Sequence, residues 1–425
     1  MMLFLLAWLG LVLIRPQEYP ALVDMGVPIL PIALLAALGT WAIGRERRPF
    51  DQPTYLLFAV FIVIGMFTVA VNGWIGGALP RFLEFLPALL ALTLVAQAGY
   101  STRNCYRIMW VISLSAMVLT IHGIEQVKLG EGWTGMPTVQ DGRIQYVGIF
   151  SDPNDLAMLF VMAIPMTLLM AGRGGLLGLR RLFWWTVAAT LLYGVYLTDS
   201  RGAFLAVMAM AGIWLWLRRG LLVAGTLGAA GMAVLMMLPT RMQELDAGES
   251  SAYGRIETWY DGIQMFIANP VFGVGVGNFT EHTWLTAHNS FVLVLAETGI
   301  VGYTVWLAMV VYCFLMPIMV LRLPATMEDP GHQQLWIEER RMAMTLLVSL
   351  VGFFACAFFL SRSYVILLYI LLGLVTGWYG GAQERWSGLP AFSVQRDWFK
   401  WCVLSVASAI GLWLVVKVLF VLAGS

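Results

Sequence analysis

The chain is organised as a succession of apolar stretches separated by short polar segments. The apolar stretches cover approximately residues 2–14, 27–43, 55–71, 82–98, 108–127, 156–171, 183–198, 203–217, 221–238, 290–320, 342–360, 365–379 and 401–422. Their apolar residues run continuously instead of alternating, so membrane-spanning strands are excluded and helices are predicted. At about 20 residues per span, we predict an all-α integral membrane protein, a single polytopic domain over residues 1–425 with about 12 (12–13) transmembrane helices.

Composition supports the same class. Of the 425 residues, 60% are hydrophobic and 12% are charged, whereas a soluble domain is about half apolar and a quarter charged. The net charge of +1 gives no reason to expect a nucleic-acid partner, so the partners expected from composition are membrane lipids. The run at residues 2–14 has neither a basic start nor a small-residue cleavage site, and we interpret it as a first span.

The basic residues predict the orientation of the chain. Six loops placed on one side carry 16 of the 25 basic residues. These loops are 45–53, 100–107, 172–182, 218–220, 322–341 and 381–400. By the positive-inside rule this side is cytoplasmic. The other side then includes residues 128–155 and the longest loop, 239–289, whose few basic residues need an explanation.

One such residue is Arg201, in the turn Thr198-Asp199-Ser200-Arg201-Gly202 between two apolar runs. It could pair with Asp199 or reach a lipid phosphate. Alternatively, an arginine on a tight turn presents a rigid fork for phosphate oxygens. Both interpretations place Arg201 at the outer membrane surface.

The long outer loop carries a second basic residue, Arg255. Residues 254–268 have helical character, with an apolar stripe formed by Ile256, Trp259, Ile263 and Phe266. Arg255 and Glu257 do not face each other on a helix, so Arg255 is expected to have another partner. The following Gly273-Val274-Gly275-Val276-Gly277 lacks the strand-then-helix setting of a nucleotide loop. Its glycines are expected to allow tight turns and close backbone approach.

A histidine opens the apolar helix after this loop. His288 precedes Asn289 and Ser290, and a histidine at a helix start on the membrane surface can exchange a proton near neutral pH; alone, it could equally be an interfacial residue without a role. Glu297 follows nine residues later and would lie about half a turn out of phase on the same helix. We therefore do not assign Glu297 as the carboxylate that orients His288. Instead, Glu297 is expected to be buried where Gly299 and Gly302 permit close helix approach.

Two further segments carry candidate polar groups. In Ser151-Asp152-Pro153-Asn154-Asp155, either Asn154 or Asp155 is expected to cap the following helix. The alternative is a divalent-ion site formed by Asp152 and Asp155, although we expect a metal-independent protein. Arg362, between two late apolar stretches, is interpreted first as an anchor to lipid phosphate and alternatively as part of an anion site.

Taken together, several of these motifs resemble the O-antigen ligase and polymerase superfamily. They comprise Pro153-Asn154, Ser200-Arg201-Gly202, Arg255 to Trp259 leading to Asn269-Pro270 and Gly273-Val274-Gly275, His288-Asn289, and Glu297-x-Gly299-x-x-Gly302. The matching region covers roughly residues 148–302. The remainder matches only as generic spans, and a thirteenth span would depart from the family's usual even count.

The resemblance implies a GT-C-like inverting glycosyltransferase with part of its active site on the 239–289 loop, which would be helical and periplasmic. Such an enzyme of the bacterial inner membrane transfers glycan from undecaprenyl pyrophosphate to an acceptor. Carried over to this chain, His288 would be the general base, and Arg201 and Arg255 would bind the pyrophosphate. Asn154, Asn289, Glu297 and Arg362 are possible additional site residues. The donor is already activated, so no cofactor or metal is expected.

The motifs do not distinguish the acceptor. The leading hypothesis is an O-antigen ligase that uses lipid A–core oligosaccharide. The alternatives are an O-antigen or exopolysaccharide polymerase and a protein O-oligosaccharyltransferase. A transporter of lipid-linked glycan is a more distant alternative, because a transporter would carry polar residues near the bilayer midplane, whereas Arg201, Arg255 and His288 are predicted at one face.

Overall fold

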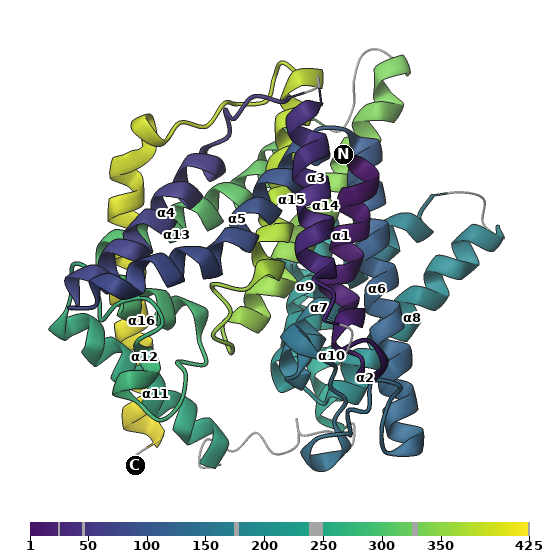
Figure 1. The fold of residues 1–425 in the computed structure, drawn as a ribbon. Coiled ribbons are helices and arrows are strands. Elements are labelled where there is room, and N and C mark those ends of the chain that lie inside the picture. The colour runs from purple at the N-terminus through teal and green to yellow at the C-terminus, as the bar shows by residue number, and fades with distance from the viewer. Residues whose placement is uncertain (24–25, 45–46, 174–177, 238–249, 325–329, 424–425) are drawn as a thin grey trace.

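The computed structural model is a bundle of helices (Figure 1) and describes residues 1–23, 26–44, 47–173, 178–237, 250–324 and 330–423. Each of the thirteen apolar stretches forms a helix, with helices in several interhelical connections as well. The α-helices are α1 (Met2–Ile14), α2 (Pro20–Val23), α3 (Ile29–Ile43), α4 (Pro53–Val71), α5 (Ala78–Gly99), α6 (Thr102–Leu129), α7 (Pro153–Ala171), α8 (Leu179–Thr198), α9 (Arg201–Arg219), α10 (Leu221–Met237), α11 (Ser250–Ala268), α12 (Phe279–His282), α13 (Ser290–Arg322), α14 (Pro330–Ala357), α15 (Ile366–Arg385) and α16 (Val394–Ala423). The predicted all-α membrane fold is confirmed.

Not every apolar helix is long enough to cross a bilayer. Within the described residues, nine helices satisfy both length and hydropathy for a span, and two shorter apolar helices, Ile29–Ile43 and Leu221–Ala233, accompany them. α1 has 13 residues, which correspond to about 20 Å of helix against a hydrocarbon core of about 30 Å. The start of α1 and the end of α16 lie toward opposite ends of the bundle (Figure 1).

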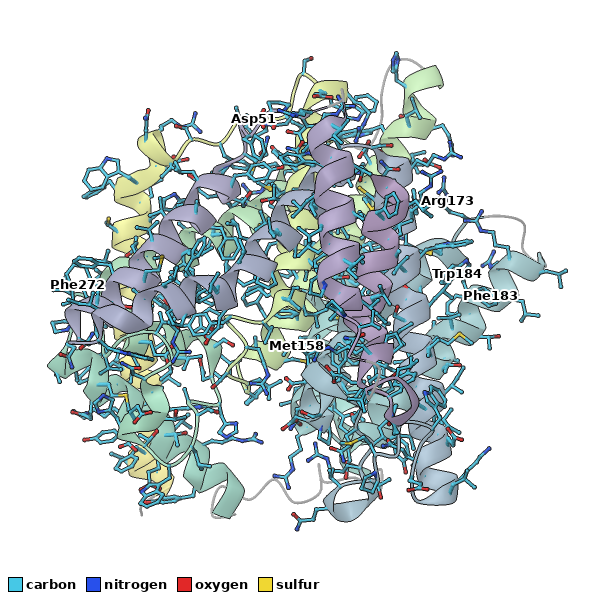
Figure 2. All side chains as sticks on the ribbon, viewed as in Figure 1. Asp51, Met158, Arg173, Phe183, Trp184 and Phe272 are labelled. Atoms are coloured by element: carbon cyan, nitrogen blue, oxygen red, sulfur yellow. The ribbon has the colours of Figure 1, made fainter. Side chains whose placement is uncertain are left out.

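The predicted loops separate into two groups in space. The connections α3–α4 and α15–α16 lie at the top of Figure 1, whereas α11 and α12 lie at the bottom. Arg173, in the predicted loop 172–182, pairs with Glu338 of α14 at 2.9 Å and lies over the Tyr106 ring (Figure 2). Residues 45–46, 174–177, 239–249 and 325–329 of the predicted loops lie outside the described residues.

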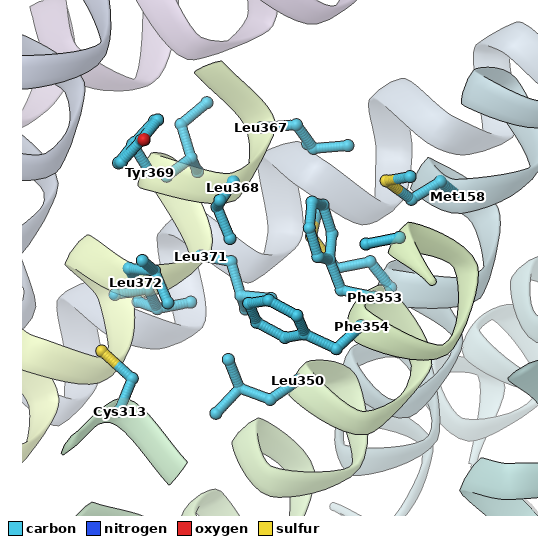
Figure 3. Close-up of a cluster of buried hydrophobic side chains, with 14 of the residues drawn as sticks. Met158, Cys313, Leu350, Phe353, Phe354, Leu367, Leu368, Tyr369, Leu371 and Leu372 are labelled. Atoms are coloured by element: carbon cyan, nitrogen blue, oxygen red, sulfur yellow. The ribbon is translucent and has the colours of Figure 1, made fainter. Parts of the chain in front are cut away.

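The core lies where α7, α13, α14 and α15 meet. Met158, Cys313, Phe353 and Leu371 come from these four helices and are all buried (Figure 3). α7 and α15 are buried along most of their lengths, so they form the centre of the bundle. Helices such as α16 present much of their apolar surface outward, as a lipid-facing helix does.

Glycines allow α5 and α15 to pack backbone to backbone. A Cβ at Gly377 would lie 2.1 Å from the Ala96 carbonyl oxygen, and a Cβ at Gly373 would lie 2.7 Å from the Leu92 carbonyl oxygen. Gly381, one helical turn further on, meets the Tyr100 carbonyl oxygen in the same way. This spacing of four residues places the small residues on one face of α15, where van der Waals contact drives helix association in a membrane.

α13 contains a break that shapes the region around it. Gly299 has φ 60° and ψ −166°, a conformation that L side chains rarely adopt. A Cβ at this position would lie 2.4 Å from the Val271 carbonyl oxygen. Both features explain why glycine occupies the position. The backbone that approaches Gly299 closely belongs to the loop around Val271, and not to a neighbouring helix as predicted.

Segment 270–275 replaces the helical hydrogen bonds lost at this break. In a regular helix the Ile300 and Val301 N–H groups would donate to the carbonyls of Ala296 and Glu297. Instead, Ile300 N–H donates to the Pro270 carbonyl at 2.8 Å and Val301 N–H to the Val271 carbonyl at 3.3 Å. The Ala296 carbonyl accepts from Val274 N–H at 3.0 Å, and the Glu297 carbonyl accepts from Gly275 N–H at 2.9 Å. The outer loop and α13 are therefore locked together.

The contact between α5 and α15 generates a stability prediction. We expect Gly377→Ala to destabilise the protein by about 1–3 kcal/mol, because the added methyl group would overpack against the α5 backbone. Thermal unfolding of the purified protein in detergent measures the change. Gly411→Ala in α16 is the matched control, because a Cβ there meets no atom within 4 Å. Equal unfolding midpoints for the two variants would contradict the proposed packing.

Candidate functional site

Arg201 begins α9 directly after a tight turn. Asp199 ends α8 in the left-handed conformation with φ 45°, and the Ser200 side chain accepts a hydrogen bond from the Ala203 N–H and so caps α9. The turn reverses the chain within two residues. Arg201 therefore starts a helix and projects from an N-terminus, where partial positive charge favours an anionic ligand.

Arg201 and Arg255 lie in the wall of one pocket. This pocket is lined by residues of the 199–203 turn, by Arg255 of α11, by Arg143 and Asn154, and by Cys356, Phe359 and Leu360. Its enclosed volume is about 30 Å³, so a diphosphate would lie across its open side instead of inside it. The structure thus brings together two arginines that are more than fifty positions apart in sequence.

Arg255 projects from α11, as the predicted helix over 254–268 requires. Trp259 and Ile263 of the apolar stripe are buried, and Trp259 contacts the Phe358 ring at 5.6 Å. On another face of α11, Tyr260 stacks on Phe420 of α16 at 4.4 Å. These two contacts hold α11 against the end of α14 and against α16, and α11 also packs on α13. Together these neighbours position Arg255.

Arg143 is a pocket residue that the sequence analysis did not single out. Its Nε donates to the Thr198 carbonyl at 2.8 Å, and its Nη2 donates to Asn154 Oδ1 at 3.1 Å. It therefore connects the turn before Arg201 to the start of α7. The available signal was its position as an isolated basic residue in loop 128–155, on the side where basic residues are disfavoured.

Asp152 caps α7, which corrects the prediction that Asn154 or Asp155 does so. The Asp152 side chain accepts from the Asn154 N–H at 2.6 Å. Pro153 follows at the first helical position, where its fixed φ is favourable, so the cap falls one residue before the proline. Asn154 is in the first turn, and its side-chain amide also donates to Asp152, at 2.9 Å.

Asp155 forms an ion pair with Arg362, which corrects the interpretation of Arg362 as an anchor to lipid phosphate. The Arg362 Nη2 donates to Asp155 Oδ2 at 2.6 Å, and its Nε donates to Asp155 Oδ1, so the pair is bidentate. Asp155 is therefore committed to a guanidinium. In the part of the chain that the structure describes, no group of three acidic, histidine or cysteine side chains is arranged to hold a metal ion.

Hydrogen bonds attach the turn that carries Arg362 to the start of α13. Ser290 Oγ donates to the Leu360 carbonyl at 2.6 Å and accepts from the Arg362 N–H at 2.9 Å. Ser363 Oγ donates to the Ser290 carbonyl at 2.8 Å. Because Ser290 is two residues beyond His288, these bonds hold Arg362 beside the histidine.

His288 precedes α13 in a strained backbone conformation. Its φ of 46° is left-handed, which is uncommon for a residue other than glycine. The next residue, Asn289, caps α13 by accepting from the Phe291 and Val292 N–H groups at 2.9 and 3.1 Å. Its Nδ2 is buried and makes no hydrogen bond to any described residue. The cap orients the chain at His288 and explains why asparagine occupies position 289.

The surroundings of His288 favour its neutral form. Burial lowers the pKa of His288, and the positive charges of Arg255 and Arg362 lower it further, whereas Asp152 acts in the opposite direction. His288 does not line the pocket that contains Arg201 and Arg255. Arg255 connects the two, because it lines the pocket and its charge also lowers the pKa of His288. A neutral imidazole beside two guanidinium groups can accept a proton from a bound hydroxyl.

Glu297 makes its hydrogen bond to the chain that follows the glycine-containing segment Gly273–Gly277. Its Oε1 accepts from the Phe279 N–H at 3.2 Å, and its other neighbours include Tyr364 and Arg81. Gly273, Gly275 and Gly277 all have positive φ, so the predicted tight turns are confirmed. A Cβ at Gly277 would collide with the Arg81 guanidinium at 2.4 Å. Glu297 therefore stabilises the loop that docks on α13.

The region that contains Arg201, Arg255 and His288 is similar to a known protein family. Residues 186–307 match the family model described as O-antigen ligase. The match includes Arg201, Arg255, His288, Asn289 and Glu297, whereas Arg143, Asn154 and Arg362 lie outside it. No curated protein is significantly similar to the chain.

The family match agrees with the motifs found in the sequence and supports a function of the O-antigen ligase or polymerase type in a multi-pass membrane protein. Members of this family are enzymes of a glycosyltransferase-like kind, whose substrates are glycans linked to lipid. Residues 186–307 are therefore similar to an O-antigen ligase domain, and this match supports the resemblance to the O-antigen ligase superfamily.

Proposed function

We propose that the protein transfers O-antigen glycan from undecaprenyl pyrophosphate to lipid A–core oligosaccharide at the periplasmic face of the bacterial inner membrane. The observation that carries this proposal is the placement of Arg201 and Arg255 on one pocket, with the Arg255 charge also acting on His288. Binding of an anionic leaving group and removal of a proton would then occur at adjoining positions.

In the proposed reaction, an acceptor hydroxyl oxygen attacks the anomeric carbon of the donor sugar. The bond from that carbon to the diphosphate oxygen breaks, and its electron pair leaves with the diphosphate. The hydroxyl proton moves to His288, and a single displacement inverts the anomeric centre. Arg201 and Arg255 would stabilise the charge that develops on the leaving oxygens, an effect that is strong in a site with little water.

Arg143, Asn154, Asn289 and Arg362 would have supporting roles. Arg143 and Asn154 would hold the turn that carries Arg201, and Asn289 and the Arg362–Asp155 pair would hold the chain at His288. Because the donor is already activated as a diphosphate, the proposed mechanism uses neither a metal ion nor a cofactor. The guanidinium groups would neutralise the diphosphate instead.

An assay with defined acceptors tests the assignment. Purified protein supplied with undecaprenyl pyrophosphate-linked glycan is expected to form product on lipid A–core oligosaccharide, and not on a second carrier-linked glycan or on a serine- or threonine-containing peptide. Extension of the carrier-linked glycan would assign a polymerase instead, and product on the peptide would assign a protein O-oligosaccharyltransferase.

Removal of the proposed base gives a second prediction. We expect His288→Ala to lower the rate of transfer by about 10²–10⁴-fold, the usual contribution of general base catalysis, while carrier binding is retained. His282→Ala is the matched control, because this exposed histidine lies at the end of α12 on the same loop. Unimpaired transfer by the His288 variant would remove the general-base role.

A third prediction separates the two arginines. Arg201→Gln and Arg255→Gln are both expected to weaken carrier binding and to slow transfer by about 10²-fold, because each removes a charge-assisted contact. Only Arg255→Gln is expected to move the pH profile, because the Arg255 charge lowers the pKa of His288. His288 accepts a proton only when neutral, so a raised pKa moves the acid limb of kcat/KM to higher pH.

Rates of transfer measured across the pH range test this separation. Lys128→Gln, an exposed basic residue at the end of α6, controls for loss of one positive charge on the same side. An acid limb that shifts equally in the Arg201 and Arg255 variants, or in neither, would contradict the proposed electrostatic coupling.

A further inference from the structure

A second cavity is lined by residues other than those of the arginine pocket. It opens between α8, α9 and α14 and has α7 as its floor, and its volume is about 610 Å³. Sites for small organic ligands commonly measure about 300–1,000 Å³. None of the residues singled out above for the proposed transfer reaction lines this cavity.

The cavity exists because two consecutive helices diverge. α8 and α9 are joined by the two-residue turn at 199–200, yet α8 packs mainly on α6 and α7 whereas α9 packs mainly on α10 and α14. Trp185 and Leu192 of α8 therefore face Val207 and Trp214 of α9 across an open space.

The lining is apolar along the cavity and cationic at one end. Apart from Thr345 and the two arginines Arg218 and Arg341, the residues that line it are apolar side chains and Gly172. Arg218 is in the last turn of α9, and both arginines belong to loops predicted to be cytoplasmic. The charged end of the cavity is thus the end at which the bundle carries most of its arginines.

The two guanidinium groups are available for an anion. Both are exposed, and within the described residues neither side chain makes a hydrogen bond or an ion pair with a carboxylate. Arg218 lies 5.2 Å from the Trp214 ring centroid, a contact that leaves its N–H groups free to donate. The adjacent Arg340 differs, because its Nη1 donates to the Val320 and Leu323 carbonyls.

The length of the cavity along α9 corresponds to one leaflet of a bilayer. Val207 and Arg218 are separated by about 16 Å along α9, at 1.5 Å per residue, which is about half of a hydrocarbon core of about 30 Å. A molecule with acyl chains of one leaflet and a negative headgroup therefore matches the cavity in length, in polarity and in charge. Basic pockets between transmembrane helices on the cytoplasmic side are a known form of anionic lipid site.

We propose that this cavity binds one anionic phospholipid of the cytoplasmic leaflet, with its acyl chains between α8 and α9 and its phosphate on Arg218 and Arg341. The bound lipid fills the space between helices that do not pack on each other. The site is distinct from the proposed transfer site, so the proposal does not depend on the identity of the glycan or of the acceptor.

Native mass spectrometry of the full-length protein tests the proposal. The protein in detergent is equilibrated with equal amounts of phosphatidylglycerol and phosphatidylcholine, and we expect one phosphatidylglycerol molecule to be retained preferentially. For Arg218→Gln/Arg341→Gln, we expect this preference to fall by about 30-fold, because each arginine near the membrane surface attracts anionic lipid. Arg219→Gln/Arg322→Gln removes the same charge from exposed positions that do not line the cavity, and we expect it to keep the preference.

A second variant tests the apolar part of the site. Ala211 lines the cavity and is exposed, so Ala211→Phe adds a ring to the open space without loss of charge, and we expect it to abolish retention of phosphatidylglycerol. Equal retention of both phospholipids by the unsubstituted protein, or an undiminished preference in the Arg218/Arg341 variant, would overturn the proposal. Displacement of phosphatidylglycerol by a neutral polyprenol would also overturn it and would assign the cavity to an isoprenoid chain.

Discussion

A helix that breaks within an apolar bundle must find new partners for the backbone groups that the break releases, because hydrocarbon offers none. In α13 the break at Gly299 releases the carbonyls of Ala296 and Glu297 and the N–H groups of Ile300 and Val301. Segment 270–275 satisfies all four. At Gly273 the absence of a side chain lets this segment lie against α13, because a Cβ there would lie 2.4 Å from the Ala296 carbonyl oxygen. The arrangement of the loop between α11 and α13 depends on this exchange of hydrogen bonds.

The break determines where the candidate site can form. Segment 270–275 connects α11, which carries Arg255, to the chain that leads to His288, and both of its ends are held by α13. The buried Glu297 adds a hydrogen bond to the Phe279 N–H from within the same helix. The motif around Glu297 and Gly299 is therefore structural support, and the groups suited to chemistry project from the elements that it holds.

A second set of contacts joins the other segments that surround the candidate site. The bidentate pair of Arg362 with Asp155 joins the α14–α15 turn to α7, and Ser290 joins the same turn to α13. Arg143 joins the loop before α7 to the turn before Arg201. Four segments far apart in the chain thus meet around His288 and the arginine pocket. Burial and the positive charges of Arg255 and Arg362 lower the pKa of His288 there, which favours the neutral imidazole.

The sequence by itself determined the helical membrane class, the positions of the apolar helices, the helix at α11 and the glycine turns, because each depends on local residue type and on the period of apolar residues. It also singled out Arg201 and Arg255 as candidates, because basic residues are disfavoured on the predicted outer side. His288 became a candidate because a histidine at a helix start can exchange a proton near neutral pH. Only the tertiary structure showed that Arg201 and Arg255 share a pocket, that Arg143 belongs to it, and that Asp155 binds Arg362. It also moved the α7 cap to Asp152 and identified the partner of Glu297. These features depend on contacts between segments whose spacing along the chain carries no information about their distance in space. The break at Gly299 is the clearest case, because its stability depends on hydrogen bonds from a loop that precedes the helix by some twenty residues.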